Sequence, residues 1–242
     1  MSSDKRVALF VTCLVDQVMP EVGVATVRLL RRAGYEVDFP GEQSCCGQPF
    51  FNSGFRKEAR RLARRTVDVL ADEPLIVLPS GSCTTMIRHE YPHLLKDEPN
   101  YYYRARRLAA KSFELSEFLA QEAQWQPQAA AGAPSVTYHD SCHMCRTLGL
   151  SAEPRRLLQQ AGCQLTEMSE SDRCCGFGGL FSMRMPEVSN AMTDEKRKQA
   201  GETGAHVLVS ADPGCLMQMR GWPEAQEQRV EHLSVVLEEV TR

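Results

Sequence analysis

The sequence has 242 residues, a net charge of -3 and ten cysteines. Basic and acidic residues are mixed along it, so nucleic acid is not expected as a partner, and no apolar stretch approaches the roughly 20 residues of a membrane-spanning helix. The apolar run Val7 to Val11 is also too short for a signal peptide. We therefore expect a cytoplasmic protein, and in that reducing compartment ten cysteines favour metal, cluster or redox chemistry over a disulfide framework.

The first half of the sequence alternates short β-type runs with helical patterns. The pattern predicts strands over 7–11, 35–39 and 75–78, and helices over 21–32, 55–71, 84–90 and 99–124. Gly34 is expected to end the first helix. The segment 40–54 is rich in Gly, Pro, Ser and Asn, which predicts a loop.

The second half repeats this order. The pattern predicts strands over 136–139, 164–168 and 206–210, a loop over 169–179, and helices over 152–161, 186–204 and from 213 onward. The segment between the halves has the composition of a linker. Because strands alternate with helices, we predict an α/β fold of two tandem, pseudo-equivalent domains, each with a parallel sheet flanked by helices. Their predicted ranges are 1–125 and 134–242, with 126–133 as the linker.

Eight of the ten cysteines fall on an internal repeat. The pair Cys45-Cys46, followed by a glycine, recurs 129 positions later as Cys174-Cys175, again followed by a glycine. Each pair has one further cysteine before it and one after it. The first cysteine set is Cys13, Cys45, Cys46 and Cys83, and the second is Cys142, Cys174, Cys175 and Cys215. The sequence is therefore a tandem duplication built around thiols.

The predicted elements bring the members of each set together. Cys13 follows a strand, the Cys45-Cys46 pair lies on a loop beyond a strand end, and Cys83 lies near a helix N-terminus, where a thiolate is favoured. In open parallel sheets such sites assemble at the carboxyl ends of the strands. Iron and zinc both bind four thiolates. Adjacent cysteines favour an iron–sulfur centre over zinc, because neighbouring side chains can reach different irons.

Further residues beside the sets are candidates for a supporting role. A histidine there could bind the metal, donate a hydrogen bond to sulfur or cap a turn, and we favour the latter two roles. Ser80 and Asp212 precede predicted helices, where both are ordinary caps. Cys145 could be a fifth ligand or a resolving thiol, whereas Cys163 is expected in the core. The supporting candidates are Ser80, Asp212, His139, His143 and Cys145.

The twofold Cys…CCG…Cys arrangement, closed by Pro-Ser-Gly-Ser-Cys at 79–83 and by Asp-Pro-Gly-Cys at 212–215, resembles the cysteine-rich CCG-domain family. That family includes the B subunit of heterodisulfide reductase and the iron–sulfur subunits of glycolate oxidase and anaerobic glycerol-3-phosphate dehydrogenase. The resemblance covers essentially the whole chain, and the length and two repeats match its stand-alone members. It implies an iron–sulfur electron-transfer component, with one cluster per domain, of an oxidoreductase complex that converts L-lactate to pyruvate.

The same resemblance implies partners and a cluster type. The partners would be a ferredoxin-like iron–sulfur subunit and a third small subunit. The small-molecule hydroxy acid would bind to the complex that these subunits form with the chain. The family motif closes with Cys-x-x-Cys, but Ser80 and Asp212 occupy the first of those two positions. Four thiols instead of five favour a 4Fe-4S cubane or a more labile centre over the noncubane cluster of heterodisulfide reductase, and they disfavour heterodisulfide cleavage.

Three other functions remain open from the sequence. The chain could serve a complex that oxidises glycolate or glycerol 3-phosphate, be a zinc-stabilised scaffold, or be a thiol–disulfide reductase that uses its cysteines directly. A nicotinamide or flavin fingerprint is missing from the sequence, since Cys-Cys-Gly-Phe-Gly-Gly does not have the required glycine spacing between a strand and a helix.

Overall fold

The computed structural model describes residues 5–129, 131–221 and 228–241. The chain divides into two compact units, Met1–Leu119 and Ala120–Arg242, and each contains a four-stranded parallel sheet. The predicted fold class is confirmed. The predicted linker, 126–133, includes residue 130, which lies outside the described residues, and its limits remain a prediction. Gln121 precedes the predicted linker but belongs to the second unit, where its side chain donates to Glu153 at 2.8 Å.

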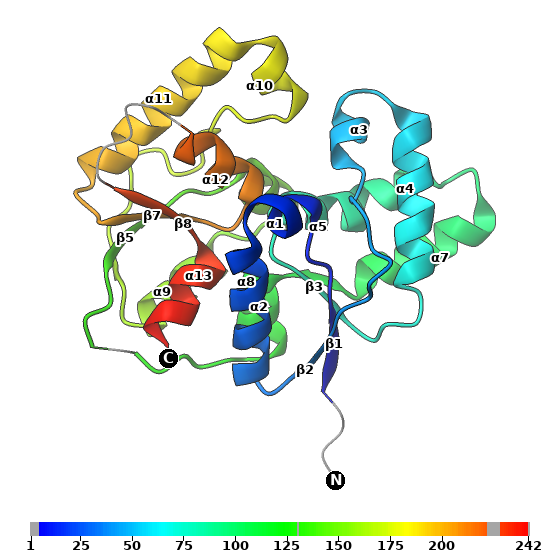
Figure 1. Ribbon diagram of the computed structural model, residues 1–242, viewed down its shortest axis with the longest axis horizontal. Coiled ribbons are helices and arrows are strands. Elements are labelled where there is room, and N and C mark those ends of the chain that lie inside the picture. Colours follow the sequence, from blue (N-terminus) through cyan, green and yellow to red (C-terminus); the bar gives the residue numbers. More distant parts are fainter. Residues whose placement is uncertain (1–4, 130, 222–227, 242) are drawn as a thin grey trace. The chain divides into compact units, whose positions relative to one another are not determined.

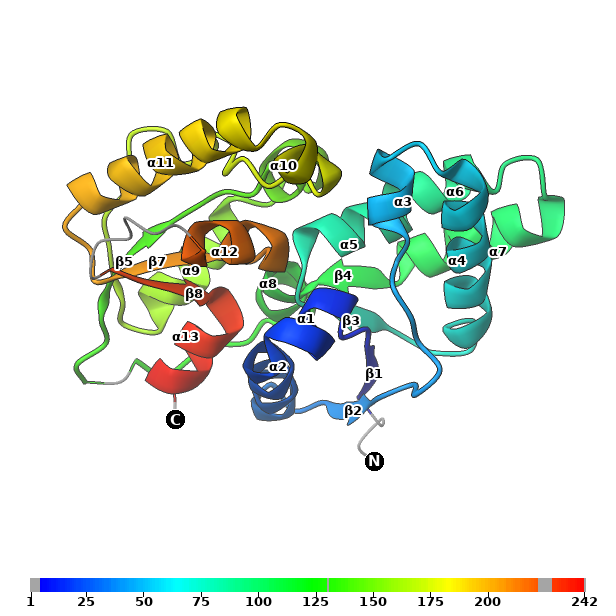
Figure 2. The same cartoon turned by 45° about the horizontal axis from the view of Figure 1, so that its top comes forward.

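The sheet of the first unit has the strand order β2-β1-β3-β4. Its strands are β1 (Arg6–Leu9), β2 (Glu36–Asp38), β3 (Ile76–Leu78) and β4 (Ser112–Glu114). The helices are α1 (Cys13–Val18), α2 (Pro20–Arg32), α3 (Gln48–Asn52), α4 (Arg56–Val69), α5 (Gly81–Thr85), α6 (Tyr91–Leu94), α7 (Pro99–Ala110) and α8 (Leu115–Glu117), with the π-helical turn η1 (Met86–Glu90). A second π-helical turn, η2 (Phe118–Glu122), spans the boundary between the units. Helices α1 and α2 lie on one side of β1, and α4 and α7 lie on the other (Figures 1 and 2).

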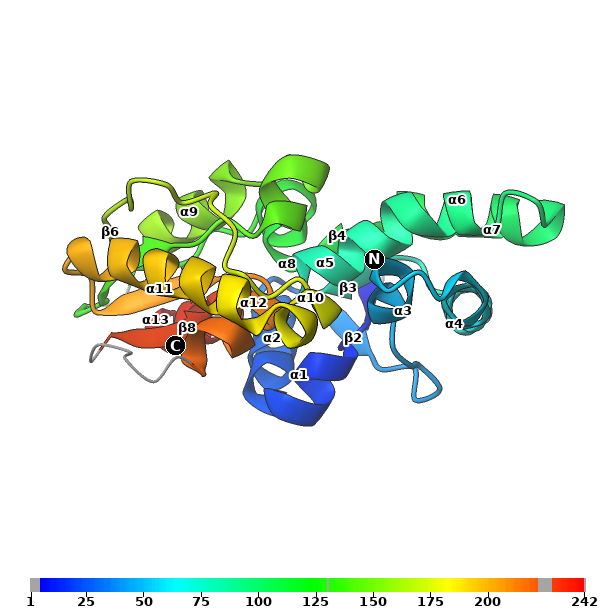
Figure 3. The same ribbon diagram turned by 90° about the horizontal axis from the view of Figure 1, so that it is seen from above.

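The second unit has the equivalent order β6-β5-β7-β8. Its strands are β5 (Ser135–Tyr138), β6 (Gln164–Leu165), β7 (Val207–Ser210) and β8 (Arg229–His232). Its helices are α9 (Ala152–Gln160), α10 (Leu180–Arg184), α11 (Pro186–Glu202), α12 (Pro213–Arg220) and α13 (Leu233–Val240), with the π-helical turn η3 (His143–Leu148). Helix α11 follows α10 directly and lies on the face of the sheet opposite α9 and α13 (Figures 1 and 3).

Most predicted elements are present, and the differences have local causes. The predicted end of the first helix is confirmed, because Gly34 has φ +87° and the backbone N–H of Tyr35 closes the turn onto the Leu30 carbonyl at 3.1 Å. The predicted loop 40–54 contains the short helix α3, which begins after Gly47. The predicted helix 99–124 is interrupted by β4, in which Ser112 and Glu114 are buried polar residues that gave no strand signal.

The two sheets are built in the same register. Beyond the central strand of the first unit, the backbone N–H of Phe10 donates to the Val77 carbonyl at 3.0 Å. In the second unit the N–H of His139 donates to the Val209 carbonyl at 2.8 Å. Phe10 and His139 therefore occupy the same place, at the carboxyl end of the central strand. In the part of the chain that the structure describes, no helix is both long and apolar enough to cross a membrane.

Each sheet ends in a strand whose last residue caps the next helix. The Glu114 carboxyl accepts the backbone N–H of Ser116 at 2.7 Å, and the His232 Nδ1 accepts that of Ser234 at 3.1 Å. Glu114 is fully buried, and this burial raises its pKa to about 8. The folded protein therefore keeps a proton on this carboxyl at pH values where the unfolded chain has lost it.

The buried Glu114 should make the first unit less stable as the pH rises. Its folded-state pKa exceeds the ordinary value of 4.5, so the free energy of unfolding falls between about pH 4.5 and about pH 8. Glu114→Gln keeps a capping oxygen and cannot ionise, so the variant should lose this part of the decline. Urea unfolding at several pH values measures it, and parallel pH profiles for the two proteins would contradict the expectation.

Gly176 allows the second cysteine loop to lie against α11. Its φ is +90°, and a Cβ there would stand 2.4 Å from the Ser189 carbonyl oxygen. Ser189 Oγ in turn donates to the Gly176 carbonyl at 2.9 Å. This position therefore needs glycine for two reasons, its backbone angle and its close approach to the helix.

Gly176→Ala should destabilise the second unit more than Gly204→Ala does. Both glycines have positive φ, where alanine costs roughly 1–2 kcal/mol, but no atom lies within 4 Å of the Cβ position at Gly204. The clash with Ser189 should add about 1–3 kcal/mol at Gly176. Urea unfolding of the two metal-free variants measures the difference, and equal losses of stability would show that the loop yields without cost.

Candidate metal centres

The four thiols of the first cysteine set lie in a continuous row. Cys13 begins α1, the Cys45-Cys46 pair lies on the loop before α3, and Cys83 is in the first turn of α5. The Sγ of Cys13 lies 3.6 Å from that of Cys45, and the Sγ of Cys46 lies 3.3 Å from that of Cys83. Thr12, directly before the row, has φ +73°, a strained angle for a β-branched residue of the kind found at functional sites.

The second set repeats this arrangement. Cys142 directly precedes η3, the Cys174-Cys175 pair lies on the loop before α10, and Cys215 is in the first turn of α12. The thiol of Cys142 contacts Cys174, and that of Cys175 contacts Cys215. In both sets the first two cysteines are half-buried and the last two are buried. The structure thus brings together all eight cysteines of the repeat as two groups of four.

One cysteine in each set is held as a thiolate. The thiol of Cys13 donates to Cys45, and together with the neighbouring Cys46 it lowers the pKa of Cys45 to about 3. In the second set Cys142 and Cys175 lower the pKa of Cys174 to about 2. The backbone N–H two residues further on, from a glycine in both loops, also donates to that sulfur at 3.4 Å. A thiolate is the form of cysteine that binds metals, so both loops are prepared for a cation.

The donors fit a metal or cluster held by thiolates. Four sulfurs at about 2.3 Å from one tetrahedral ion would stand about 3.8 Å apart, which is close to the separations in the first set. An open pocket of about 320 Å³ adjoins Cys13 and Cys45, with Gln43 also in its lining. The first set is therefore partly accessible from the surface.

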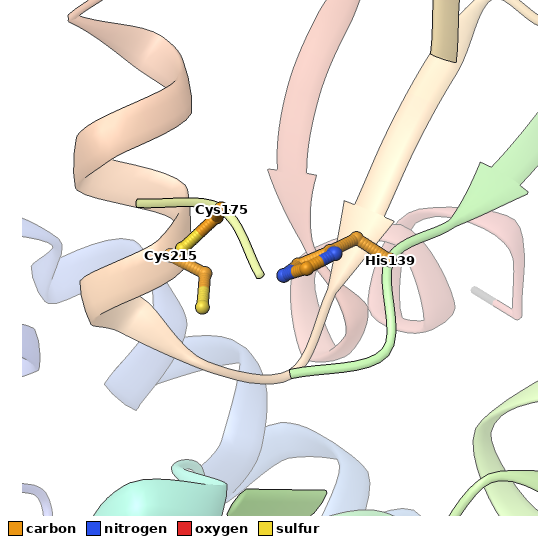
Figure 4. Close-up of side chains that lie close together, drawn as sticks. All are labelled: His139, Cys175 and Cys215. Carbon is orange, nitrogen blue, oxygen red and sulfur yellow. The ribbon is translucent and has the colours of Figure 1, made fainter. Parts of the chain in front are cut away.

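His139 lies at the second set. Its ring nitrogen and the sulfurs of Cys175 and Cys215 are all within 4.8 Å of one another. Figure 4 shows one edge of the ring directed toward the two cysteine side chains. The residue is fully buried, and this burial, together with the charge of Lys196, lowers its pKa to about 4, so the imidazole is neutral at physiological pH.

The other supporting candidates have more local roles. Ser80 and Asp212 are N-caps, and they accept the backbone N–H of Cys83 at 3.3 Å and of Gly214 at 3.1 Å. The Nδ1 of His143 lies 3.8 Å from the Cys142 sulfur. Cys145 is half-buried, and its thiol has no hydrogen bond to another described residue, so the structure does not join it to the second set. Cys163 is buried, as expected, and burial raises its pKa to about 11.

Three residues at the centres were missed in the sequence. Tyr91 donates to the Cys46 carbonyl at 2.8 Å, and Thr193 donates to the Cys175 carbonyl at 2.9 Å, so each cysteine pair is anchored by a buried hydroxyl. Lys196, one turn beyond Thr193, is fully buried with its ammonium on the Glu170 carbonyl and 3.6 Å from the Met168 sulfur. Only the basic run 196–198 could have drawn attention to it.

Comparison with known proteins identifies the family. The model of the cysteine-rich domain, CCG, matches residues 7–88 and 136–220. The chain is 46% identical over 235 residues to lactate utilization protein A of Bacillus subtilis, covering 96% of this chain and 98% of that protein. It is 45% identical over 239 residues to the protein of that name from an Exiguobacterium species, covering 97% of each.

A solved structure supports the fold alone. The crystal structure of a hypothetical protein from Helicobacter pylori aligns with a TM-score of 0.70 and 10% sequence identity. The alignment covers 99% of this chain and 49% of that one.

The resemblance inferred from the cysteine motifs is confirmed: the chain belongs to the cysteine-rich CCG-domain family, together with the relatives named lactate utilization protein A.

Proposed function

We propose that each unit holds an iron–sulfur centre on its cysteine set and that the chain carries electrons in a cytoplasmic complex that oxidises L-lactate to pyruvate. The observation that carries the proposal is the convergence of four thiols from three separate segments in both units. The names of the relatives, which align over nearly the full length, supply the substrate. The proposed ligands are Cys13, Cys45, Cys46 and Cys83, and Cys142, Cys174, Cys175 and Cys215.

The chemistry of the substrate suits such a carrier. Oxidation of lactate to pyruvate releases two electrons and two protons. An iron–sulfur centre supplies a one-electron acceptor and donor, and two centres on one chain can pass on both electrons. The chain's own residues hold the thiolates and direct backbone N–H groups at them, which favours the reduced, more negative state of a centre. The half-buried Cys13 and Cys45, beside their pocket, bring the first centre near the surface, where a partner can reach it.

The rest of the reaction is assigned to partners. A ferredoxin-like iron–sulfur subunit and a third small subunit complete the proposed complex, and the hydroxy acid is bound with their participation. Glycolate and glycerol 3-phosphate are the related substrates from which lactate must be distinguished. Parallel assays of the complex with the three substrates make that distinction.

A zinc-stabilised scaffold is the second candidate, and the sulfur separations favour it. Neighbouring sulfurs at 3.3 and 3.6 Å have the spacing of ligands on one ion. The adjacent cysteines of each set favour a multi-iron centre instead, since structural zinc sites generally use Cys-x-x-Cys. Zinc content without inorganic sulfide in anaerobically purified protein would select the scaffold.

Loss of one ligand from either set should impair electron transfer. In the complex, Cys46→Ala and Cys175→Ala should each lower lactate-dependent reduction of an acceptor dye by more than about tenfold. Cys163→Ala is the matched control, because Cys163 is also buried but lies outside both sets, and it should leave the rate within about twofold. A complex with all eight repeat cysteines replaced by serine that still oxidised lactate would contradict the proposal.

A further inference from the structure

His139 occupies a position that does not need a polar side chain for folding. Its counterpart in the first unit, Phe10, makes the same backbone hydrogen bond to the neighbouring strand and is fully buried in an apolar core. A phenyl ring therefore satisfies this place in the fold. An imidazole there buries two polar nitrogens at the same point, which is unfavourable unless they find a partner.

Neither ring nitrogen of His139 makes a hydrogen bond of normal geometry to another described residue, although the Ser171 backbone lies close enough to the ring to raise its pKa slightly against the effect of burial. The residue is also completely excluded from solvent, so bulk water cannot satisfy them. Buried polar atoms in folded proteins are nearly always paired, so an unpaired one points to a partner such as an ordered water, an ion or a ligand. A histidine ring can offer a nitrogen lone pair, which is the donor that metals accept from this residue.

The surroundings of His139 indicate that a metal could bind its ring nitrogen. One ring nitrogen lies within 4.8 Å of the sulfurs of both Cys175 and Cys215, and the ring edge is directed toward them (Figure 4). The ring forms no hydrogen bond to either sulfur. Metal–nitrogen and metal–sulfur bonds of about 2.0 and 2.3 Å place a nitrogen and a sulfur roughly 3.5 Å apart on one tetrahedral ion. Three donors that already lie within 4.8 Å of one another can therefore bind one metal after a small inward shift.

We propose that His139 is a ligand of the centre in the second unit, which makes that centre a mixed nitrogen–sulfur site while the first centre has sulfur ligands only. The inference rests on the proposed function in that a metal occupies the second cysteine set. Imidazole is a neutral donor, so the two centres carry different charge and differ in reduction potential or metal preference. The duplicated chain thus holds two chemically distinct sites.

The test uses the full chain, purified without oxygen after growth on histidine labelled with nitrogen-15. Iron and sulfide analysis first establishes whether the proposed centres are present. Pulsed electron paramagnetic resonance of the reduced protein then measures nitrogen hyperfine couplings. We expect one strong coupling that changes with the label, that disappears in His139→Phe and that persists in His143→Phe, the control for the histidine beside Cys142.

The outcomes separate this inference from the proposed function. Iron–sulfur centres whose labelled histidine couplings are no stronger than those of backbone amides would overturn the ligand role and leave the proposed function standing. A strong coupling that is lost in His143→Phe would also overturn it. If His139→Phe does not fold, His139→Asn, with a smaller side chain, replaces it in the same measurement.

A zinc protein would be diagnosed differently. Zinc without sulfide overturns the proposed function, and the ligand question then passes to protein exchanged with cadmium-113, whose nuclear resonance separates sites with sulfur ligands only from sites that include a nitrogen ligand. The ligand role predicts two resonances in the unchanged protein, one from an all-sulfur site and one from a site with a nitrogen ligand. In His139→Phe the second resonance should shift to the all-sulfur range. Two all-sulfur resonances, or a protein that binds neither metal, contradict it.

Discussion

The structure depends on holding two adjacent cysteines on a loop so that both sulfurs meet thiols from other segments. In each unit a buried hydroxyl anchors the carbonyl of the second cysteine of the pair, Tyr91 from α6 in the first and Thr193 from α11 in the second. The glycine that follows has positive φ in both loops and donates its N–H back to the first sulfur. The two units therefore meet the same constraint with different helices.

The parallel sheet supplies the rest of the convergence. Because the carboxyl ends of parallel strands meet at one edge, residues that follow β1 and β3 approach the cysteine loop although they are distant in sequence. Cys83 and Cys215 lie in the first turns of α5 and α12 and complete the two cysteine sets. The side chains of Ser80 and Asp212 cap these helices and fix where each one begins. A loss of either cap would disturb a thiol as well as a helix.

The two cysteine sets and most elements could be predicted from the sequence, because a repeat offset and strand–loop–helix order are local properties. The strand β4 could not, since Ser112 and Glu114 are polar and their burial is visible only in the folded structure. Lys196 was missed for the same reason. The lack of a partner at His139 likewise becomes visible only with the fold.

The central claim is that the cysteine sets hold redox-active iron–sulfur centres. It is tested most directly by metal and sulfide analysis of the anaerobically purified chain, with electron paramagnetic resonance spectra recorded before and after reduction. The account predicts iron with matching sulfide and a signal that changes on reduction. Zinc without sulfide, and a spectrum unchanged by reductant, would contradict it.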